Sequence, residues 1–219
     1  MKFKAVVFDM DGVLVKSESS WEKLHKHFNV CGLGNFIKYL NGEITYKEFM
    51  LLDTLLWIKA KKSIHRDEIE EVLLNEEFVD GAKEAIGNLK RHGLITMILT
   101  SGIDILANHV AKTLGINYVL ANSLVFDKNG YLKPGGIARV PLLDKDKVLY
   151  CWSLKKNIKL REIVYVGDSV YDIPVFMSNV FSVAYTCDRS VSKKANISFC
   201  SSRLDEVGEY IIGLAFNNT

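Results

Sequence analysis

The stretch Phe3-Lys-Ala-Val-Val-Phe-Asp-Met-Asp-Gly12 places two carboxylates directly after a short apolar run. The apolar residues 5–8 predict a strand that is buried on both faces. Asp9 and Asp11 are two positions apart, so an extended chain directs both side chains to one side. Two carboxylates this close repel each other unless a cation lies between them, and Mg²⁺ prefers oxygen ligands. The stretch is therefore a candidate magnesium site if further acids reach it from other strands, and an ordinary Gly-containing turn if they do not.

Composition and charge narrow the class of protein. The chain has 219 residues, 48% of them hydrophobic and 25% charged, which is typical of a soluble globular protein. A formal net charge of +2 gives no electrostatic basis for binding nucleic acid or a membrane surface. No apolar run approaches the ~20 residues of a membrane span, and the start of the chain does not resemble a signal peptide. We expect a cytoplasmic protein.

The cysteines do not form a recognisable pattern. They lie far apart in the sequence without any C-x-x-C pair, at Cys31, Cys151, Cys187 and Cys200. This spacing indicates neither a zinc site nor a disulfide framework. We expect buried, reduced thiols, as is usual in cytosolic proteins.

The order of the expected elements predicts the fold. Residues 15–78 have helical patterns only, including two capping-box spacings at Ser19–Glu22 and Thr45–Glu48. From Asp80, which we expect to cap a helix, apolar strands alternate with helices; strands are expected over residues 94–99, 118–121, 163–166, 181–184 and 197–199. This alternation predicts an α/β fold with a doubly wound, mainly parallel sheet. The helical residues 15–78 form an inserted cap domain, and residues 1–14 and 79–219 form the core.

Polar clusters follow three of the expected strands. They are Asp9-Met-Asp11, Thr100-Ser101-Gly102, and Gly167-Asp168 with Asp172 one helical turn later. Ligands bind beyond the carboxyl ends of strands in open α/β sheets, so we expect these clusters to meet at one edge. Each cluster alone is a common turn or cap, whereas the three together predict a site.

The residue types in these clusters suit phosphoryl transfer. That reaction needs an in-line nucleophile, neutralisation of the phosphoryl oxygens and a proton donor for the leaving group. An aspartate can serve as the nucleophile, and Asp168 and Asp172 add oxygen ligands for Mg²⁺.

The remaining candidates suit binding of the phosphoryl group. Thr100 can donate a hydrogen bond to a phosphoryl oxygen, and the backbone N–H groups of Ser101 and Gly102 form a candidate anion site. Lys145 or Lys147 supplies a positive charge at the start of a later helix.

The motifs together resemble the haloacid dehalogenase superfamily of phosphohydrolases. The matching stretches are Val-Val-Phe-Asp9-Met-Asp11-Gly-Val, Ile-Leu-Thr100-Ser-Gly, Lys145 and Val-Gly-Asp168-Ser-Val-Tyr-Asp172. The resemblance implies a Rossmann-like core, a Mg²⁺ cofactor and a small phosphorylated metabolite as substrate. It also implies that Asp9 is the nucleophile and a metal ligand, and that Asp11 is the general acid and base with its backbone carbonyl on the metal. By the same resemblance Thr100 holds the phosphoryl group, Lys145 rather than Lys147 steadies it, Asp168 binds Mg²⁺, and Asp172 supports or joins the metal ligands.

Within the superfamily the chain resembles phosphoserine phosphatases. Glu18 occupies the position of a cap glutamate that contacts the substrate amine in those enzymes. The arginine that they use for the substrate carboxylate has no counterpart, and Asp53 stands in its place. We therefore expect hydrolysis of a different small phosphomonoester. The alternatives are phosphoserine hydrolysis itself, a phosphomutase or phosphotransferase, and a non-catalytic phosphoacceptor; the sequence does not indicate an oligomeric state.

Overall fold

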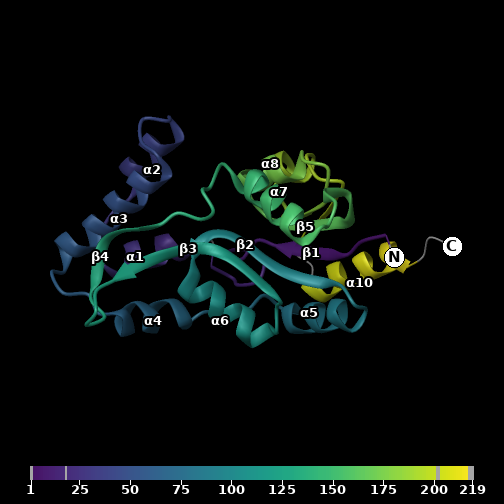
Figure 1. Cartoon of the computed structure of the whole chain (residues 1–219), viewed down its shortest axis with the longest axis horizontal. Helices are drawn as coiled ribbons and strands as arrows, with labels where there is room; N and C mark the ends of the chain where they lie inside the picture. Colours follow the sequence, from purple (N-terminus) through teal and green to yellow (C-terminus); the bar gives the residue numbers. More distant parts are fainter. Residues whose placement is uncertain (1, 18, 201–202, 217–219) are drawn as a thin grey trace.

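A seven-stranded sheet forms the centre of the computed structural model, which describes residues 2–17, 19–200 and 203–216 (Figure 1). Its strand order is β4-β3-β2-β1-β5-β6-β7, and every pair is parallel except the β3–β4 hairpin. The strands are β1 Ala5–Phe8, β2 Ile95–Ile103, β3 Tyr118–Phe126, β4 Leu132–Ile137, β5 Ile163–Gly167, β6 Phe181–Tyr185 and β7 Ile197–Phe199. The predicted α/β fold with a mainly parallel sheet is confirmed.

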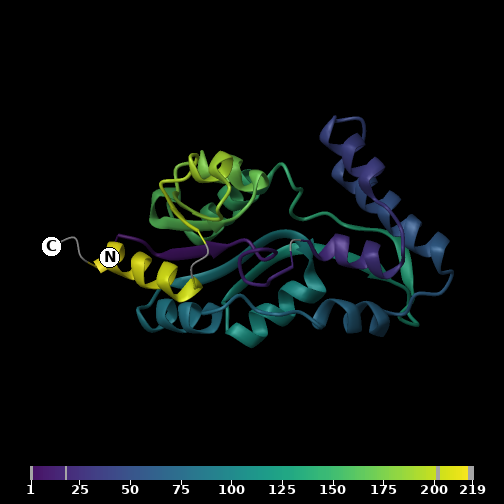
Figure 2. The same cartoon turned by 180° about the vertical axis from the view of Figure 1, so that it is seen from behind.

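Helices cover both faces of this sheet (Figures 1 and 2). One face carries α5 Ala82–Arg91, α6 Asp104–Leu114 and α10 Leu204–Phe216; the other carries α7 Lys145–Lys156, α8 Ile173–Phe176 and α9 Arg189–Ser192. A hydrophobic core lies on each face of the sheet, and β1 contributes side chains to both. Its side chains alternate, so that Val6 and Phe8 pack in one core and Ala5 and Val7 in the other. Two 3₁₀ turns, η1 Leu160–Glu162 and η2 Val170–Asp172, flank β5. The sheet is doubly wound, as the sequence predicted.

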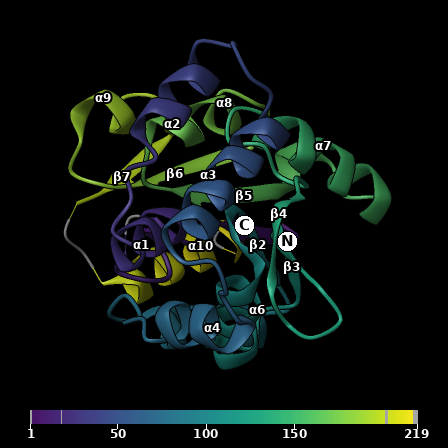
Figure 3. The same cartoon turned by 90° about the vertical axis from the view of Figure 1, so that its left-hand side faces the viewer.

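Four helices lie between β1 and α5 in the chain. They are α1 Ser20–His27, α2 Leu33–Leu40, α3 Tyr46–Ala60 and α4 Arg66–Leu74, and none of the described residues 15–78 forms a strand longer than a single bridge. They lie toward the left-hand end of the molecule in Figure 1, and Figure 3 looks onto that end, where α3 contacts β4. Glu22 donates its backbone N–H to the Ser19 hydroxyl, and Thr45 and Glu48 form a complete capping box. None of the helices among the described residues is both long and apolar enough to cross a membrane.

Two predicted boundaries are wrong. Strand β2 does not end at Leu99 but continues through an irregularity to Ile103, so Thr100-Ser101-Gly102 are part of the strand. Helix α5 is capped by Gly81 rather than Asp80. Gly81 has a φ of 81° and a side chain there would collide with Asp205, which is why a glycine occupies the position.

The expectation of four buried, reduced cysteines is also wrong. Cys187 and Cys200 form a disulfide bond that joins the end of β6 to the end of β7. Cys31 and Cys151 are free and exposed rather than buried. The separation of 13 residues gave no signal in the sequence, because the two thiols meet only once the strands pair.

Candidate active site

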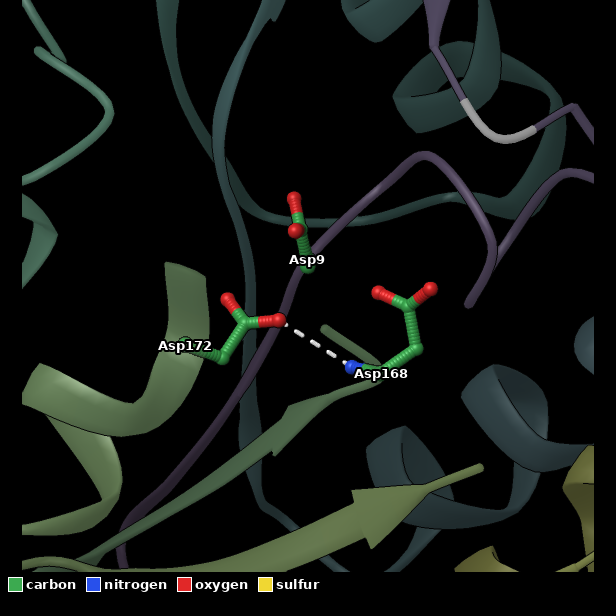
Figure 4. Close-up of side chains that lie close together, drawn as sticks. All are labelled: Asp9, Asp168 and Asp172. Atoms are coloured by element: carbon green, nitrogen blue, oxygen red, sulfur yellow. Dashed lines mark hydrogen bonds between the residues drawn. The ribbon is translucent and has the colours of Figure 1, made fainter. Parts of the chain in front are cut away.

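Three carboxylates from two neighbouring strands meet at the carboxyl end of the sheet (Figure 4). β1 and β5 are paired in register, with Phe8 opposite Val166, so that their ends lie side by side. Asp9, Asp168 and Asp172 each offer an oxygen within 4.8 Å of the others. The site lies where the strand order reverses around β1, the usual binding position in such sheets.

Lys145 contacts two of these three carboxylates. Its Nζ donates to Asp9 Oδ2 at 2.5 Å and to Asp172 Oδ1 at 2.8 Å, and its side chain is only 2% exposed. Burial disfavours its charge, but Asp172 and Asp9 outweigh this effect and raise the pKa of Lys145. Lys147 is 74% exposed at its side chain and pairs with Asp144 instead. The geometry therefore places Lys145, and not Lys147, among the carboxylates.

The Asp172 carboxylate has little capacity left for a further ligand. It is fully buried and accepts five hydrogen bonds, from Lys145, the Tyr165 hydroxyl, the backbone N–H groups of Asp168 and Ser169, and the Ser169 hydroxyl. Burial alone would raise the pKa of Asp172, but the Lys145 charge and these bonds lower it. Asp172 thus fixes the backbone that carries Asp168 and holds a negative charge beside Lys145.

Asp168 faces the turn that follows Asp9. A Cβ on Gly12, whose φ is 76°, would come within 2.2 Å of Asp168 Oδ2, so only glycine allows this approach. Burial raises the pKa of Asp168 to about 8, and the Asp9 and Asp172 charges add to the effect. The ionised form of Asp168 is therefore disfavoured unless a positive ion binds beside it.

The Asp11 carboxylate is only partly satisfied by hydrogen bonds. Its Oδ2 accepts a 3.3 Å hydrogen bond from the Ser20 hydroxyl, whereas its buried Oδ1 has no partner among the described residues. Burial raises the pKa of Asp11 to about 7, and the Asp9 charge adds to this. A Cβ on Gly102 would lie 2.7 Å from Asp11 Oδ2, so Asp11 lies against the end of β2. A carboxyl with this pKa can hold or release a proton near neutrality.

The end of β2 lies beside these acids with both hydroxyls inward. Thr100 is 1% exposed, and its Oγ1 accepts a hydrogen bond from Gly102 N at 3.0 Å, leaving its own proton free to be donated. The Ser101 hydroxyl is buried without a hydrogen-bond partner among the described residues. The Gly102 N–H donates to the Thr100 hydroxyl, so it is less free to bind an anion than the sequence suggested. The next N–H group, of Ile103, donates to the Ser20 hydroxyl.

One cavity of about 1190 Å³ lies between the sheet edge and the helices α1–α3. Its lining includes Asp9, Asp11, Thr100, Ser101, Gly102, Lys145 and Asp168. The Ser101 carbonyl, near the end of β2, connects helices α1 and α3 to the sheet. It accepts hydrogen bonds from Trp21 Nε1 on α1, the Tyr46 hydroxyl on α3 and Asn122 Nδ2 on β3, at 2.9–3.0 Å. The sequence analysis did not identify Trp21 and Tyr46 as part of the site. It also missed Ser20 and Tyr165 as partners of Asp11 and Asp172, because these contacts depend on how the chain turns between the paired residues and no local pattern indicates them.

The donor set fits a hard divalent cation. Asp9 and Asp168 present carboxylate oxygens within 4.8 Å of each other, and the pKa of each is raised, for Asp9 to about 6 by burial against the opposing Lys145 charge. Oxygen-only ligands of this kind suit Mg²⁺. Glu18, the expected contact for a substrate amine, lies outside the described residues.

Residues 3–176 match the model of the haloacid dehalogenase-like hydrolases. Since this match covers most of the chain, the protein belongs to that family of hydrolases.

The chain is also similar to several phosphoserine phosphatases along nearly its whole length. It is 26% identical to that of Methanocaldococcus jannaschii, covering 96% of this chain and 98% of the relative. It is 27% identical to that of Lactococcus lactis subsp. lactis, covering 96% of each chain. The solved structure of a phospho-aspartyl intermediate analogue of phosphoserine phosphatase matches with a TM-score of 0.78 at 23% identity, over 96% of this chain and 99% of that one. The predicted family, its phosphoserine phosphatase-like branch and the prediction of a phosphatase are confirmed at this level.

Proposed function

We propose that the protein hydrolyses a small phosphomonoester with the help of Mg²⁺, through a phosphorylated Asp9. The observation that carries this is the joint position of Asp9, Asp11 and Asp168 around one cavity, with Lys145 bonded to Asp9. The relatives support it, since a phospho-aspartyl analogue is the subject of one solved phosphoserine phosphatase. We also propose a cytoplasmic location, where small phosphorylated metabolites are used.

In the first step an Asp9 oxygen attacks phosphorus and the bond from phosphorus to the ester oxygen breaks. Asp11, whose pKa of about 7 leaves it partly protonated near neutrality, gives its proton to the departing alkoxide. In the second step water attacks the phosphorus of the aspartyl phosphate and passes a proton to Asp11. The bond between phosphorus and the Asp9 oxygen breaks, so that phosphate leaves and Asp9 is restored.

The other residues bind and orient the reacting groups. Asp9, Asp168 and the Asp11 backbone carbonyl would hold Mg²⁺, which neutralises charge on the phosphoryl oxygens. Thr100 donates a hydrogen bond to the phosphoryl group and Lys145 keeps Asp9 ionised and in place. Asp172 positions Asp168 through its backbone bonds rather than as a direct ligand.

We further propose that residues 15–78 act as a cap over a core of residues 1–14 and 79–219. Trp21 and Tyr46 contribute to this, since both donate to the Ser101 carbonyl and enclose the cavity. An enclosed site excludes bulk water from the aspartyl phosphate until the alcohol has left.

Phosphate release from p-nitrophenyl phosphate and a panel of phosphorylated metabolites, including phosphoserine, tests the proposal. We expect release that requires Mg²⁺ and stops with EDTA. Asp9→Asn lowers kcat by about a thousandfold or more, because the nucleophile is lost. Asp67→Asn, at an exposed position on α4, is the matched control and retains activity. Full activity of Asp9→Asn would overturn the assignment.

Asp11→Asn separates a hydrolase from a phosphoacceptor. p-Nitrophenolate is a good leaving group, so the variant still forms the aspartyl phosphate but hydrolyses it slowly. We expect a burst of p-nitrophenol stoichiometric with the enzyme, followed by a slow phase. If Asp11→Asn turns over at the wild-type rate, Asp11 has no role in proton transfer and a phosphoacceptor gains support.

A further inference from the structure

A further buried carboxylate lines the cavity, on a helix that carries none of the catalytic carboxylates. Asp53, on α3, is fully buried and lines the cavity together with His25 and Phe36. Its Oδ1 accepts a hydrogen bond from Asn35 Nδ2 at 2.8 Å and its Oδ2 one from His25 Nε2 at 3.1 Å. Two bonds fill about half of the acceptor sites of a carboxylate.

His25 does not neutralise this charge. Trp57 Nε1, which can only donate, lies 2.7 Å from His25 Nδ1. Nδ1 is therefore an acceptor without a proton, and the single ring proton is on Nε2, facing Asp53. The imidazole is neutral, so the pair keeps the full negative charge of Asp53.

Two of the positive charges around the cavity are engaged elsewhere, and the third is exposed to water. Besides His25, the basic residues that line the cavity in the described part of the chain are Lys23, Lys26 and Lys145. Lys145 is bonded to Asp9 and Asp172, and Lys23 forms a 2.6 Å ion pair with Glu76. Lys26 is exposed on α1 and is screened by water. No cation among the described residues forms an ion pair with Asp53 apart from the neutral His25 contact.

Aromatic rings complete this part of the cavity. Trp21, Phe36, Tyr46, Phe49 and Tyr171 all line it. The ring of Phe36, on α2, packs against that of Tyr171, in the turn η2 after Asp168, with ring centroids 6.0 Å apart. This contact joins α2 to the segment that follows β5. The faces of such rings attract cations, most strongly where water is excluded.

The Ser101 side chain adds an unsatisfied polar group at the same cavity. Ser101 lines the cavity and is 6% exposed, and its buried hydroxyl has no hydrogen-bond partner among the described residues. A buried hydroxyl without a partner is unfavourable, and a polar ligand that bonds to it removes this cost.

We propose that the substrate is a phosphomonoester whose alcohol part carries a positively charged nitrogen and no carboxylate, an aminoalkyl phosphate. This inference rests on the proposed function. The phosphoryl group occupies the end of the cavity near Asp9, and the cationic nitrogen occupies the end formed by Asp53 and the aromatic rings. A carboxylate at that end would meet the negative charge of Asp53, which is unfavourable.

Binding of phosphonates tests this without turnover, because their carbon–phosphorus bond is not a phosphate ester. Calorimetry in Mg²⁺ compares 3-aminopropylphosphonate with butylphosphonate, which has the same shape but lacks the charge. We expect the amine to bind at least about tenfold more tightly, as one charge contact with partial screening gives. Equal affinities would overturn the inference and leave the phosphatase proposal untouched.

Turnover gives the second readout on the wild-type enzyme. We expect kcat/KM to be highest for 2-aminoethyl phosphate, lower for propyl phosphate, and lower for phosphoserine than for 2-aminoethyl phosphate. A preference for phosphoserine or propyl phosphate overturns the inference alone. Absence of release from all three and from p-nitrophenyl phosphate overturns the proposed function.

Asp53→Asn then assigns the preference to its residue. The substitution keeps the shape and removes the charge, so the ratio of kcat/KM between 2-aminoethyl and propyl phosphate should fall below about threefold. Glu71→Gln, an exposed charge on α4, keeps the wild-type ratio. Circular dichroism and a thermal melt check the fold of both variants, and an unchanged ratio in folded Asp53→Asn would contradict the assignment.

Discussion

Replacing Lys145 with Met removes the single buried cation that the structure places among the catalytic carboxylates in its described part. The unbranched Met side chain fills similar space but leaves Asp9 and Asp172 without their 2.5 Å and 2.8 Å ion pairs. Removing one partner of a buried ion pair typically costs about 3–5 kcal/mol in the free energy of unfolding. We expect a loss in this range for Lys145→Met in the absence of Mg²⁺ at pH 8.

Most of this loss in the free energy of unfolding should come from the unpaired charge of Asp9. Asp172 keeps its bonds from Tyr165, Ser169 and the Asp168 backbone, whereas the Asp9 carboxylate keeps, among the described residues, only the bond from the Met10 backbone N–H. Asp9→Asn in the Lys145→Met background removes the unpaired charge. The double variant should therefore recover at least about 1 kcal/mol relative to additivity.

The loss should also depend on pH. Burial already raises the pKa of Asp9 to about 6 from an ordinary value of 3.8, and removal of the ammonium raises it further. The folded variant then binds a proton that the unfolded chain has lost, so its stability is highest at low pH and falls as the pH rises through the raised pKa. The destabilisation should be smaller at pH 5 than at pH 8.

Urea unfolding in EDTA at both pH values measures these quantities. Lys147→Met is the matched control, because Lys147 is exposed two positions further along α7, and it should change stability by less than about 0.5 kcal/mol. A Lys145→Met variant within about 1 kcal/mol of wild type at pH 8, or an equal loss at both pH values, would refute this account of the site.

Three further predictions follow from the same contacts. Metal-free protein should lose thermal stability between pH 5 and pH 8, because burial raises the pKa of Asp168 to about 8. Added Mg²⁺ or the substitution Asp168→Asn should reduce that loss in a thermal melt. A melting temperature of the metal-free protein that does not change with pH would contradict this prediction. Trp21→Phe removes one donor to the Ser101 carbonyl, so steady-state kinetics should show KM rising several-fold with kcat changed by less than about threefold. Replacing Cys187 and Cys200 by Ser should lower the free energy of unfolding by about 3 kcal/mol in urea titrations, and an equal stability under reducing and oxidising conditions would exclude a role for the disulfide.

The sequence predicted the parallel sheet because its evidence is local. The buried runs at β1 and β5 are almost wholly apolar, and the capping residues Ser19 and Thr45 lie directly before their helices. The same reasoning placed Asp9 and Asp168 together, since parallel strands bring their carboxyl ends to one edge.

What could not be predicted depends on which chain segments cross. The end of β2 was misplaced because Thr100-Ser101-Gly102 has the composition of a turn, yet the segment stays extended beside β3. The disulfide joins cysteines that meet only when β6 and β7 pair, and the polar chain from Trp57 through His25 to Asp53 joins α1 to α3. The types of these residues did not indicate that they contact one another, because the contacts form only when the folded chain brings the segments together.

The most direct test is to find the residue that carries the phosphoryl group. Asp11→Asn protein is mixed with p-nitrophenyl phosphate and Mg²⁺, quenched in acid during the burst, digested, and analysed by mass spectrometry. We predict a phosphoryl group on Asp9 that is absent when EDTA is present. A phosphoryl group on another residue, or a p-nitrophenol burst without any phosphorylated peptide, would contradict the proposed chemistry of this site.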